Sequence, residues 1–148
     1  MIRKATRYDI PRLLEFVEAY AYANPIHLLG DPANHSPAHV EQLLTEIIAG
    51  RGFALIDDQM RGTIIAVRNR NIWCPNIMEL HELLWWVDPE YRNGTVGGRL
   101  WNEFNRISTE MLDSEQINLV VTSISPSGPM IDFTKRGYKP FSASFAKE

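Results

Sequence analysis

Three glycines, Gly94, Gly97 and Gly98, lie between a predicted strand and a predicted helix. The first N–H groups of a helix have no partner within it, and the aligned peptide dipoles make that end partly positive. Such a helix start binds phosphate or pyrophosphate when no side chain blocks the approach. The glycines leave the approach open, and Arg92 and Arg99 add positive charge. The segment is therefore predicted to bind a phosphate-containing ligand.

Two familiar phosphate-binding motifs do not fit this turn. The P-loop requires Gly-Lys-Ser/Thr, but Gly98 is followed here by Arg99-Leu100. The dinucleotide fingerprint requires Gly-x-Gly-x-x-Gly after a first strand, whereas this chain has Gly-x-x-Gly-Gly after several strands. A bound nucleotide is therefore disfavoured, and a plain strand-to-helix connection is the alternative interpretation.

The elements that position this turn follow from hydrophobic periodicity and from Gly and Pro breaks. Asp9 is predicted to cap the first helix, with Pro11 in its first turn. A mixed sheet with helices on both faces follows, which is an α/β (α+β) single layered domain over residues 1–148. The predicted strands are residues 2–5, 53–56, 63–67, 77–87, 117–124 and 138–145, and the predicted helices are residues 10–23, 37–49, 99–113 and 130–136, with a loop at 25–37.

Composition limits the functional classes. The 148 residues are 45% hydrophobic and 22% charged, as expected for one globular core. A net charge of -3 argues against nucleic acid as a partner. The single cysteine, Cys74, excludes an intramolecular disulfide and is typical of a reducing cytoplasm. No apolar stretch approaches the roughly 20 residues that cross a bilayer, so no membrane association is expected.

The segment Arg92-Asn93-Gly94-Thr95-Val96-Gly97, after Val87-Asp88-Pro89-Glu90-Tyr91, resembles the acetyl-CoA-binding motif of the GCN5-related N-acetyltransferases. The family usually has its first glycine where Thr95 stands. The start of the chain, Ile2–Pro11, is similar to the family's first strand and helix, and Phe133–Pro140 is similar to its late segment. The segment Trp85-Trp86-Val87-Asp88-Pro89 resembles members of the family that bacteriophages encode.

The resemblance implies a mostly antiparallel sheet and transfer of an acetyl group from acetyl-CoA to a primary amine. The amine would attack directly in a ternary complex. A small molecule, a peptide N-terminus and a lysine side chain stay open as acceptors, and a homodimer is allowed. The implied compartment is the cytoplasm of a bacterium or of a phage-infected host.

The resemblance also implies where acetyl-CoA binds. Its pantetheine arm would pair with the backbone from Trp85 to Val87, and an N–H near Val87 would bind the thioester oxygen. The pyrophosphate would lie on the amides of residues 92–98. The predicted cofactor-binding residues are Trp86, Val87, Arg92, Asn93, Gly94, Thr95, Val96, Gly97, Gly98 and Ser125, with Ser127 as the alternative to Ser125.

The implied reaction requires a base, because an alkylamine is mostly protonated at neutral pH. Glu82, Glu79 and His81 are the candidates for this catalytic role. The family's usual position falls on Leu83. Without a β-bulge Glu82 faces the opposite side of the sheet, whereas Glu79 and His81 share the side of Leu83. A solvated or ion-paired residue is the alternative interpretation for each.

The usual acid of the family falls on Phe133, which has no proton to donate. The thiolate would then leave unassisted or through water, or Tyr138 or a serine would replace the acid. The competing hypothesis is a weak or inactive acyl-CoA-binding module that acts as a sensor or interaction domain. No metal is expected. His35 and His39 are four residues apart, but Pro37 lies between them and disfavours a shared helical face, and the Glu-x-x-His or Cys context of a metal site is absent.

Overall fold

The sheet has its strands in the order β1-β2-β3-β4-β5 in the computed structural model, which describes residues 1–125 and 129–148. Strands β1 to β4 pair antiparallel, and β5 is parallel to β4. The mixed, mostly antiparallel sheet expected from the sequence is confirmed. Its strands are β1 (Ile2–Lys4), β2 (Gly52–Asp57), β3 (Gly62–Arg70), β4 (Met78–Val87) and β5 (Leu119–Val121).

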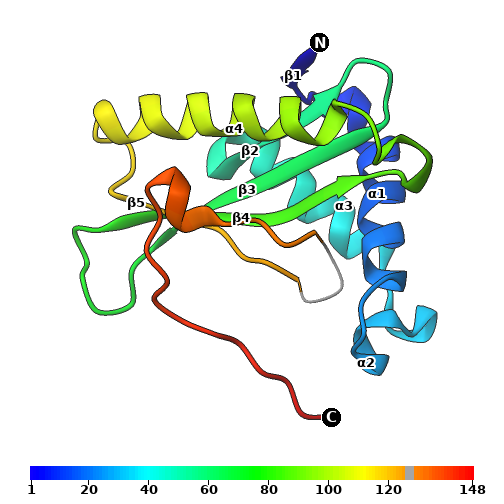
Figure 1. Cartoon of the computed structure of the whole chain (residues 1–148). Coiled ribbons are helices and arrows are strands. Elements are labelled where there is room, and N and C mark those ends of the chain that lie inside the picture. Colours follow the sequence, from blue (N-terminus) through cyan, green and yellow to red (C-terminus); the bar gives the residue numbers. More distant parts are fainter. Residues whose placement is uncertain (126–128) are drawn as a thin grey trace.

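Helices cover both faces of this sheet (Figure 1). Helix α4 lies across one face, and α1 and α3 pack on the other. The α-helices are α1 (Ile10–Tyr22), α2 (His27–Gly30), α3 (Pro37–Glu46) and α4 (Val96–Asp113). The shorter turns are η1 (Arg7–Asp9), η2 (Pro32–Asn34), η3 (Ile47–Arg51), η4 (Pro89–Tyr91) and η5 (Phe133–Arg136).

The core has two layers, one on each face of the sheet. On the α4 side, Leu100, Phe104 and Ile107 are buried at helical spacing, as the sequence predicts. On the other side, Leu13 and Phe16 of α1 are fully buried. Strands β2 and β3 lie between the two layers, so their apolar residues form continuous runs instead of alternating with polar ones.

Asp9 joins β1 to the start of α1. It stands at the N-cap position of α1, but its side chain makes no cap hydrogen bond there, which corrects the predicted role. Its carboxylate instead accepts two hydrogen bonds from Arg3, at 2.8 and 2.9 Å, and one from the Thr6 N–H at 2.7 Å. Thr6 and Asp9 thus form a capping box around η1.

Three predicted late elements differ from the structure. The predicted strand 117–124 is reduced to β5, because this edge strand pairs with β4 at only three positions. The predicted helix 130–136 is the single turn η5, which Gly137 ends with a φ of 86°. The predicted strand 138–145 pairs with no strand in the described part of the chain. The predicted loop 25–37 contains α2 and η2.

Residues 138–145 do not form a strand because the chain leaves the sheet after Tyr138. The Tyr138 ring packs on Trp101 and Phe133, and the chain beyond it runs away from β5 toward α2 (Figure 1). There the Glu148 carboxylate accepts hydrogen bonds from the His27 and Leu28 N–H groups, at 3.1 and 3.0 Å. Phe141 and Phe145 stay exposed along the way.

Candidate active site

The sheet opens between β4 and β5. Their parallel pairing ends at His81 and Val121, whereas β4 continues along β3 as far as Val87. The chain after β5 diverges from β4 on the side of α1 and α2 (Figure 1). The backbone of β4 beyond His81 therefore has an edge that no strand of the described residues covers, which can pair with an extended ligand.

A β-bulge lies at the start of this opening. On β3, Ile65 pairs with Leu84 and its neighbour Ala66 pairs with Glu82, which leaves Leu83 as the extra residue of β4. An extra residue reverses the alternation of side chains on the bulged strand. The bulge sets Glu82 on the side of Ala66, which belongs to the α4 layer, while Leu84 belongs to the α1 layer.

The predicted phosphate turn leads into α4 at the end of β4. Within the described residues, no group accepts a hydrogen bond from the N–H of Val96, Gly97 or Gly98. Neither Gly97 nor Gly98 has a positive φ. A Cβ on Gly97 would meet only ordinary contacts at 3.6 Å or more, and a Cβ on Gly98 would meet nothing within 4 Å. Packing within the chain thus does not require glycine here, whereas an approaching pyrophosphate does.

The other residues of the turn surround this helix start. Thr95 is the N-cap residue and makes no side-chain cap hydrogen bond. Gly94 N–H donates to the Tyr91 carbonyl at 3.2 Å, so it belongs to the turn itself. Asn93 is exposed. Thr95 therefore leaves the first N–H groups of α4 free, although it stands where the family motif has glycine.

Arg92 points back along β4. Its Nε donates to the Val87 carbonyl at 2.8 Å, and its guanidinium lies over the Trp86 ring at 4.5 Å from the centroid. The Asp88 N–H donates toward β3, to the Arg61 carbonyl, so the N–H and carbonyl of Val87 face the open edge. The Val87 N–H thus points to where the predicted thioester would lie.

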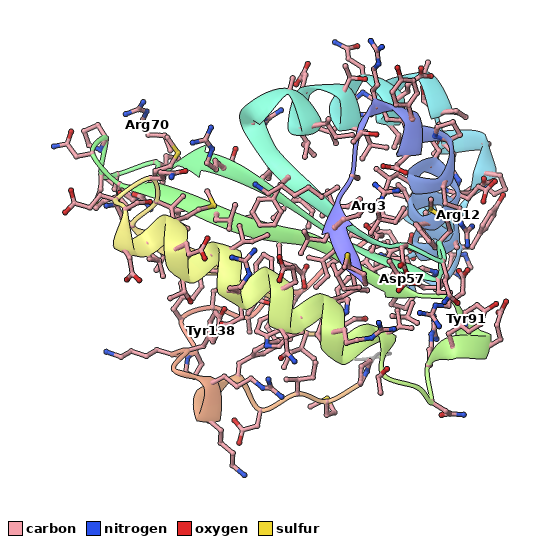
Figure 2. The ribbon with its side chains drawn as sticks, turned by 90° about the horizontal axis from the view of Figure 1, so that it is seen from above. Arg3, Arg12, Asp57, Arg70, Tyr91 and Tyr138 are labelled. Atoms are coloured by element: carbon pink, nitrogen blue, oxygen red, sulfur yellow. The ribbon has the colours of Figure 1, made fainter. Side chains whose placement is uncertain are left out.

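Arg99 contacts a carboxylate at the end of β2. Its Nη2 lies 3.7 Å from Oδ1 of Asp57, a fully buried carboxylate that also accepts hydrogen bonds from Arg61 at 2.6 and 3.0 Å. Figure 2 shows Asp57 at the end of the sheet where Arg12 and Tyr91 also lie. Arg99 therefore links the first turn of α4 to the end of β2, and its predicted contribution to a phosphate site stays a prediction.

Glu82 is the half-buried carboxyl group of the opening. Burial raises the Glu82 pKa, the nearby Thr122 hydroxyl lowers it by less, and the resulting pKa is about 7. Thr122 directly follows β5, so the two residues face each other where the strands separate. Its Oγ1 is buried and makes no regular hydrogen bond with the described residues.

Two tyrosines lie near Glu82 from different elements. Burial, and then the Glu82 charge, raise the pKa of Tyr20 on α1 and of Tyr138 after η5. The Tyr20 ring also meets the Trp86 ring edge-on, with 6.3 Å between centroids. The sequence pattern gave no role to Tyr20 or Thr122, because only the folded arrangement of α1, β4 and β5 brings them to Glu82.

Glu79 and His81, the other base candidates, lie outside the opening. Both are in the part of β4 that pairs with β5, opposite Leu119 and Val121. His81 Nε2 lies 3.6 Å from Glu79 Oε2, so the two side chains contact each other. The structure thus places Glu82, and not this pair, where the two strands diverge.

Phe133 and Tyr138 pack in an aromatic cluster on α4. Trp101 lies at its centre, stacked on Trp85 with 5.4 Å between ring centroids and 5.1 Å from the Phe133 ring. Figure 2 shows Tyr138 beside α4. Ser125 follows the opening and is half-buried with a partner of its own, and Ser127 lies outside the described residues.

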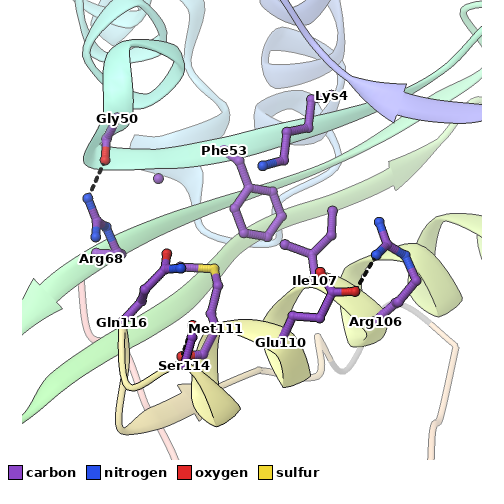
Figure 3. Close-up of a pocket in the computed structure, with 11 residues that line it drawn as sticks. Lys4, Gly50, Phe53, Arg68, Arg106, Ile107, Glu110, Met111, Ser114 and Gln116 are labelled. Atoms are coloured by element: carbon purple, nitrogen blue, oxygen red, sulfur yellow. Dashed lines mark hydrogen bonds and ion pairs between the residues drawn. The ribbon is translucent and has the colours of Figure 1, made fainter.

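A hollow of about 470 Å³ lies elsewhere, between the C-terminal half of α4 and the start of β2 (Figure 3). None of the predicted site residues lines it. The two arginines that line it already donate hydrogen bonds within the chain: Arg68 to the Gly50 carbonyl at 2.5 Å and Arg106 to Glu110 at 2.6 Å.

In the described ranges no cluster of three metal-ligating side chains occurs, and no helix is long and apolar enough to cross a membrane.

No family model and no curated protein matches the sequence. Solved structures do match, at low identity. A GCN5-related N-acetyltransferase from Ralstonia eutropha JMP134 has a TM-score of 0.69 at 18% identity, with 99% of this chain and 97% of that chain covered. A predicted acetyltransferase from Clostridium acetobutylicum, solved with acetyl-CoA, has a TM-score of 0.67 at 12% identity, with 100% and 95% covered.

A third match is an aminoglycoside acetyltransferase from an uncultured soil metagenomic sample, solved with sisomicin. Its TM-score is 0.60 at 14% identity, with 100% of this chain and 92% of that chain covered. This chain has the fold of the GCN5-related N-acetyltransferases. The resemblance to bacteriophage-encoded members stays a prediction.

Proposed function

We propose that this protein is an acetyl-CoA-dependent N-acetyltransferase that acetylates a primary amine by direct attack in a ternary complex. The observation that carries the proposal is the edge of β4 beyond His81, which no described strand covers, beside the N–H groups at the start of α4, for which the described residues offer no acceptor. A ligand with an extended amide arm and a diphosphate fits both features. The same fold in a protein solved with acetyl-CoA supports this choice.

The residues of the turn and the strand edge hold the cosubstrate in this proposal. The N–H groups of Val96, Gly97 and Gly98 bind the pyrophosphate, and the backbone from Trp85 to Val87 pairs with the pantetheine arm. The Val87 N–H donates to the thioester oxygen, where negative charge develops during attack. One well-placed donor of this kind contributes about 3 kcal/mol to transition-state stabilisation.

Glu82 is the proposed general base. The amine nitrogen forms a bond to the thioester carbonyl carbon, the carbon–sulfur bond breaks, and the sulfur leaves with the electron pair. Glu82 takes a proton from the amine, directly or through water, for which its pKa of about 7 is well matched. Tyr138 is the proposed source of a proton for the thiolate, since the Phe133 side chain has none.

The test is release of coenzyme A thiol from acetyl-CoA in the presence of primary amines. We expect release with the unaltered protein, and at least a hundredfold lower kcat/KM for Glu82→Gln. Glu79→Gln is the matched control, because it removes a carboxylate from the same strand outside the opening. Thiol release by Glu82→Gln at the unaltered rate would remove Glu82 from the mechanism.

A second candidate function is an acyl-CoA-binding module without turnover. The packing of Phe133 against Trp101 favours it, because the family's acid position is occupied by an apolar ring. Such a module would bind coenzyme A but release no thiol above background with any amine. Cytoplasmic location and a homodimer also belong to the proposal, the former in keeping with the free, exposed Cys74.

A further inference from the structure

The surroundings of Glu82 also bear on the acceptor, provided that the proposed acetyl transfer takes place. Glu82 forms none of the ion pairs in the described part of the chain. The two influences on its pKa are burial and the Thr122 hydroxyl, and no charged side chain is among them. A half-buried carboxylate without a cation is partly desolvated at a cost, so a single ammonium group from a ligand would complement it.

Uncharged side chains come next around Glu82. Tyr20 and Tyr138 bring half-buried rings with hydroxyl groups. Leu83, the bulge residue, is 43% exposed, and Ile124, two residues beyond Thr122, is 40% exposed. These side chains offer apolar surface to a ligand and provide no second carboxylate.

The apolar character continues along the end of α1. Tyr22, Leu28 and Leu29 are more than half exposed on α1 and α2. Tyr22, Ile26 and Leu28 also line a hollow of about 470 Å³, together with His27 and Asp31. This end of the molecule lies on the side toward which the chain after β5 diverges (Figure 1). Large exposed apolar groups gathered on one side of a domain indicate a binding surface.

We propose that the acceptor is a monoamine, with one ammonium group on an aromatic or aliphatic body. The ammonium would pair with Glu82, and the body would lie against Tyr20, Leu83 and Ile124. A polycation such as sisomicin, which a protein of the same fold binds, would find Glu82 as the one carboxylate beside Tyr20, Leu83 and Ile124. Asp31 and Glu148 lie at the α2 end of the surface, where their carboxylates already accept hydrogen bonds from backbone N–H groups. The chemistry fits a free amine and a peptide whose first side chain is apolar.

The experiment compares acceptors of different charge in the thiol-release assay. We expect kcat/KM for 2-phenylethylamine to exceed that for spermidine or sisomicin at least tenfold. Phenylalanyl-alanine amide separates the peptide source from the free amine, and activity with either supports the proposal. Equal or better use of spermidine or sisomicin would overturn it.

A second experiment introduces a carboxylate beside Glu82. Leu83→Asp should lower the preference for 2-phenylethylamine over spermidine at least tenfold. Ile72→Asp is the control: it changes the net charge equally at the exposed β3–β4 connection, and should leave the preference unchanged. An unchanged preference in folded Leu83→Asp would overturn the proposal. If circular dichroism shows that Leu83→Asp is misfolded, Ile124→Asp is used as the test variant in its place.

Calorimetry separates this inference from the proposed transfer. With coenzyme A present, 2-phenylethylamine should bind the unaltered protein, and Glu82→Gln should weaken binding at least tenfold. If no amine releases thiol but 2-phenylethylamine binds in this way, the proposed acetyl transfer is wrong and the proposed monoamine site is supported. If 2-phenylethylamine does not bind, or binds Glu82→Gln equally well, the monoamine site fails.

Discussion

At the scale of single residues, Glu82 shows how one extra residue in a strand can position a carboxyl group. The bulge at Leu83 sets the carboxyl group where β4 and β5 separate. Thr122 faces it from beyond β5, and Tyr20 and Tyr138 approach from α1 and from the segment after η5. Burial in this uncharged environment raises the Glu82 pKa to about 7, within the range that suits a general base near neutral pH.

The first prediction at this scale concerns the pH dependence of the rate. A base acts when it is deprotonated, so kcat/KM should rise with pH through about 7 as Glu82 loses its proton. In Glu82→Gln this rise should disappear, which leaves only the slope due to the amine itself. The check is thiol release between pH 5 and 9. An unaltered profile in Glu82→Gln, with a changed profile in Glu79→Gln or His81→Gln, would move the role to that residue.

The second prediction concerns stability. The Glu82 pKa is raised from about 4.5, so the folded state keeps its proton between about pH 4.5 and 7, and folding stability falls as pH rises through that range. Glu82→Gln removes this penalty and should be more stable than the unaltered protein by roughly 1–3 kcal/mol at pH 8, with little difference near pH 4. Urea unfolding at both pH values measures this, with exposed Glu18→Gln as the control. A loss of stability in Glu82→Gln at pH 8 would contradict the burial argument.

At the scale of elements, Asp9 holds the first strand to the first helix. Arg3 and the Thr6 N–H lower its pKa to about 2 despite the opposing effect of burial. The resulting stability is present above an unfolded pKa near 3.8 and is lost as pH falls through about 2. Asp9→Asn should therefore cost about 1–3 kcal/mol at pH 7 and less at pH 3.

The matched control for Asp9 is Asp58→Asn. Asp58 pairs with the N-terminal amine at 3.1 Å, but both groups are largely exposed. Exposed ion pairs contribute about 0–1 kcal/mol, so this variant should change stability little. Chemical unfolding at pH 7 and pH 3 compares the two. Equal losses in both variants would show that the Arg3–Asp9 pair does not hold β1 to α1.

The sequence predicts elements well where the signal is local. The stripe on α4 and the turn from Arg92 to Gly98 arise from neighbouring residues, so periodicity and glycine placement suffice to predict them. The bulge at Leu83 depends on how β3 and β4 pair, which no local pattern contains. Residues 138–145 have strand-like residues, but the aromatic contacts of Tyr138 and the path toward α2 leave them without a partner strand.

At the scale of the whole molecule, the start of α4 links ligand binding to global stability. A ligand that binds only the folded state stabilises it by about 2.7 kcal/mol at a concentration a hundred times its Kd. For a domain of this size, that should raise Tm by about 6–10 °C. Coenzyme A should produce this shift, measured by thermal unfolding. An equal shift with ATP and none with coenzyme A would instead favour a nucleotide site.

Gly97→Asp should separate ligand binding from folding at this helix start. A Cβ at Gly97 meets only ordinary contacts, and a carboxylate in the first turn interacts favourably with the helix dipole, by about 0.3–1 kcal/mol. The same carboxylate repels a diphosphate and occupies its approach. The variant should thus unfold no earlier than the unaltered protein, yet lose the shift with coenzyme A. Asn105→Asp, exposed further along α4, should keep the shift. A full shift in Gly97→Asp would mean that the diphosphate binds elsewhere.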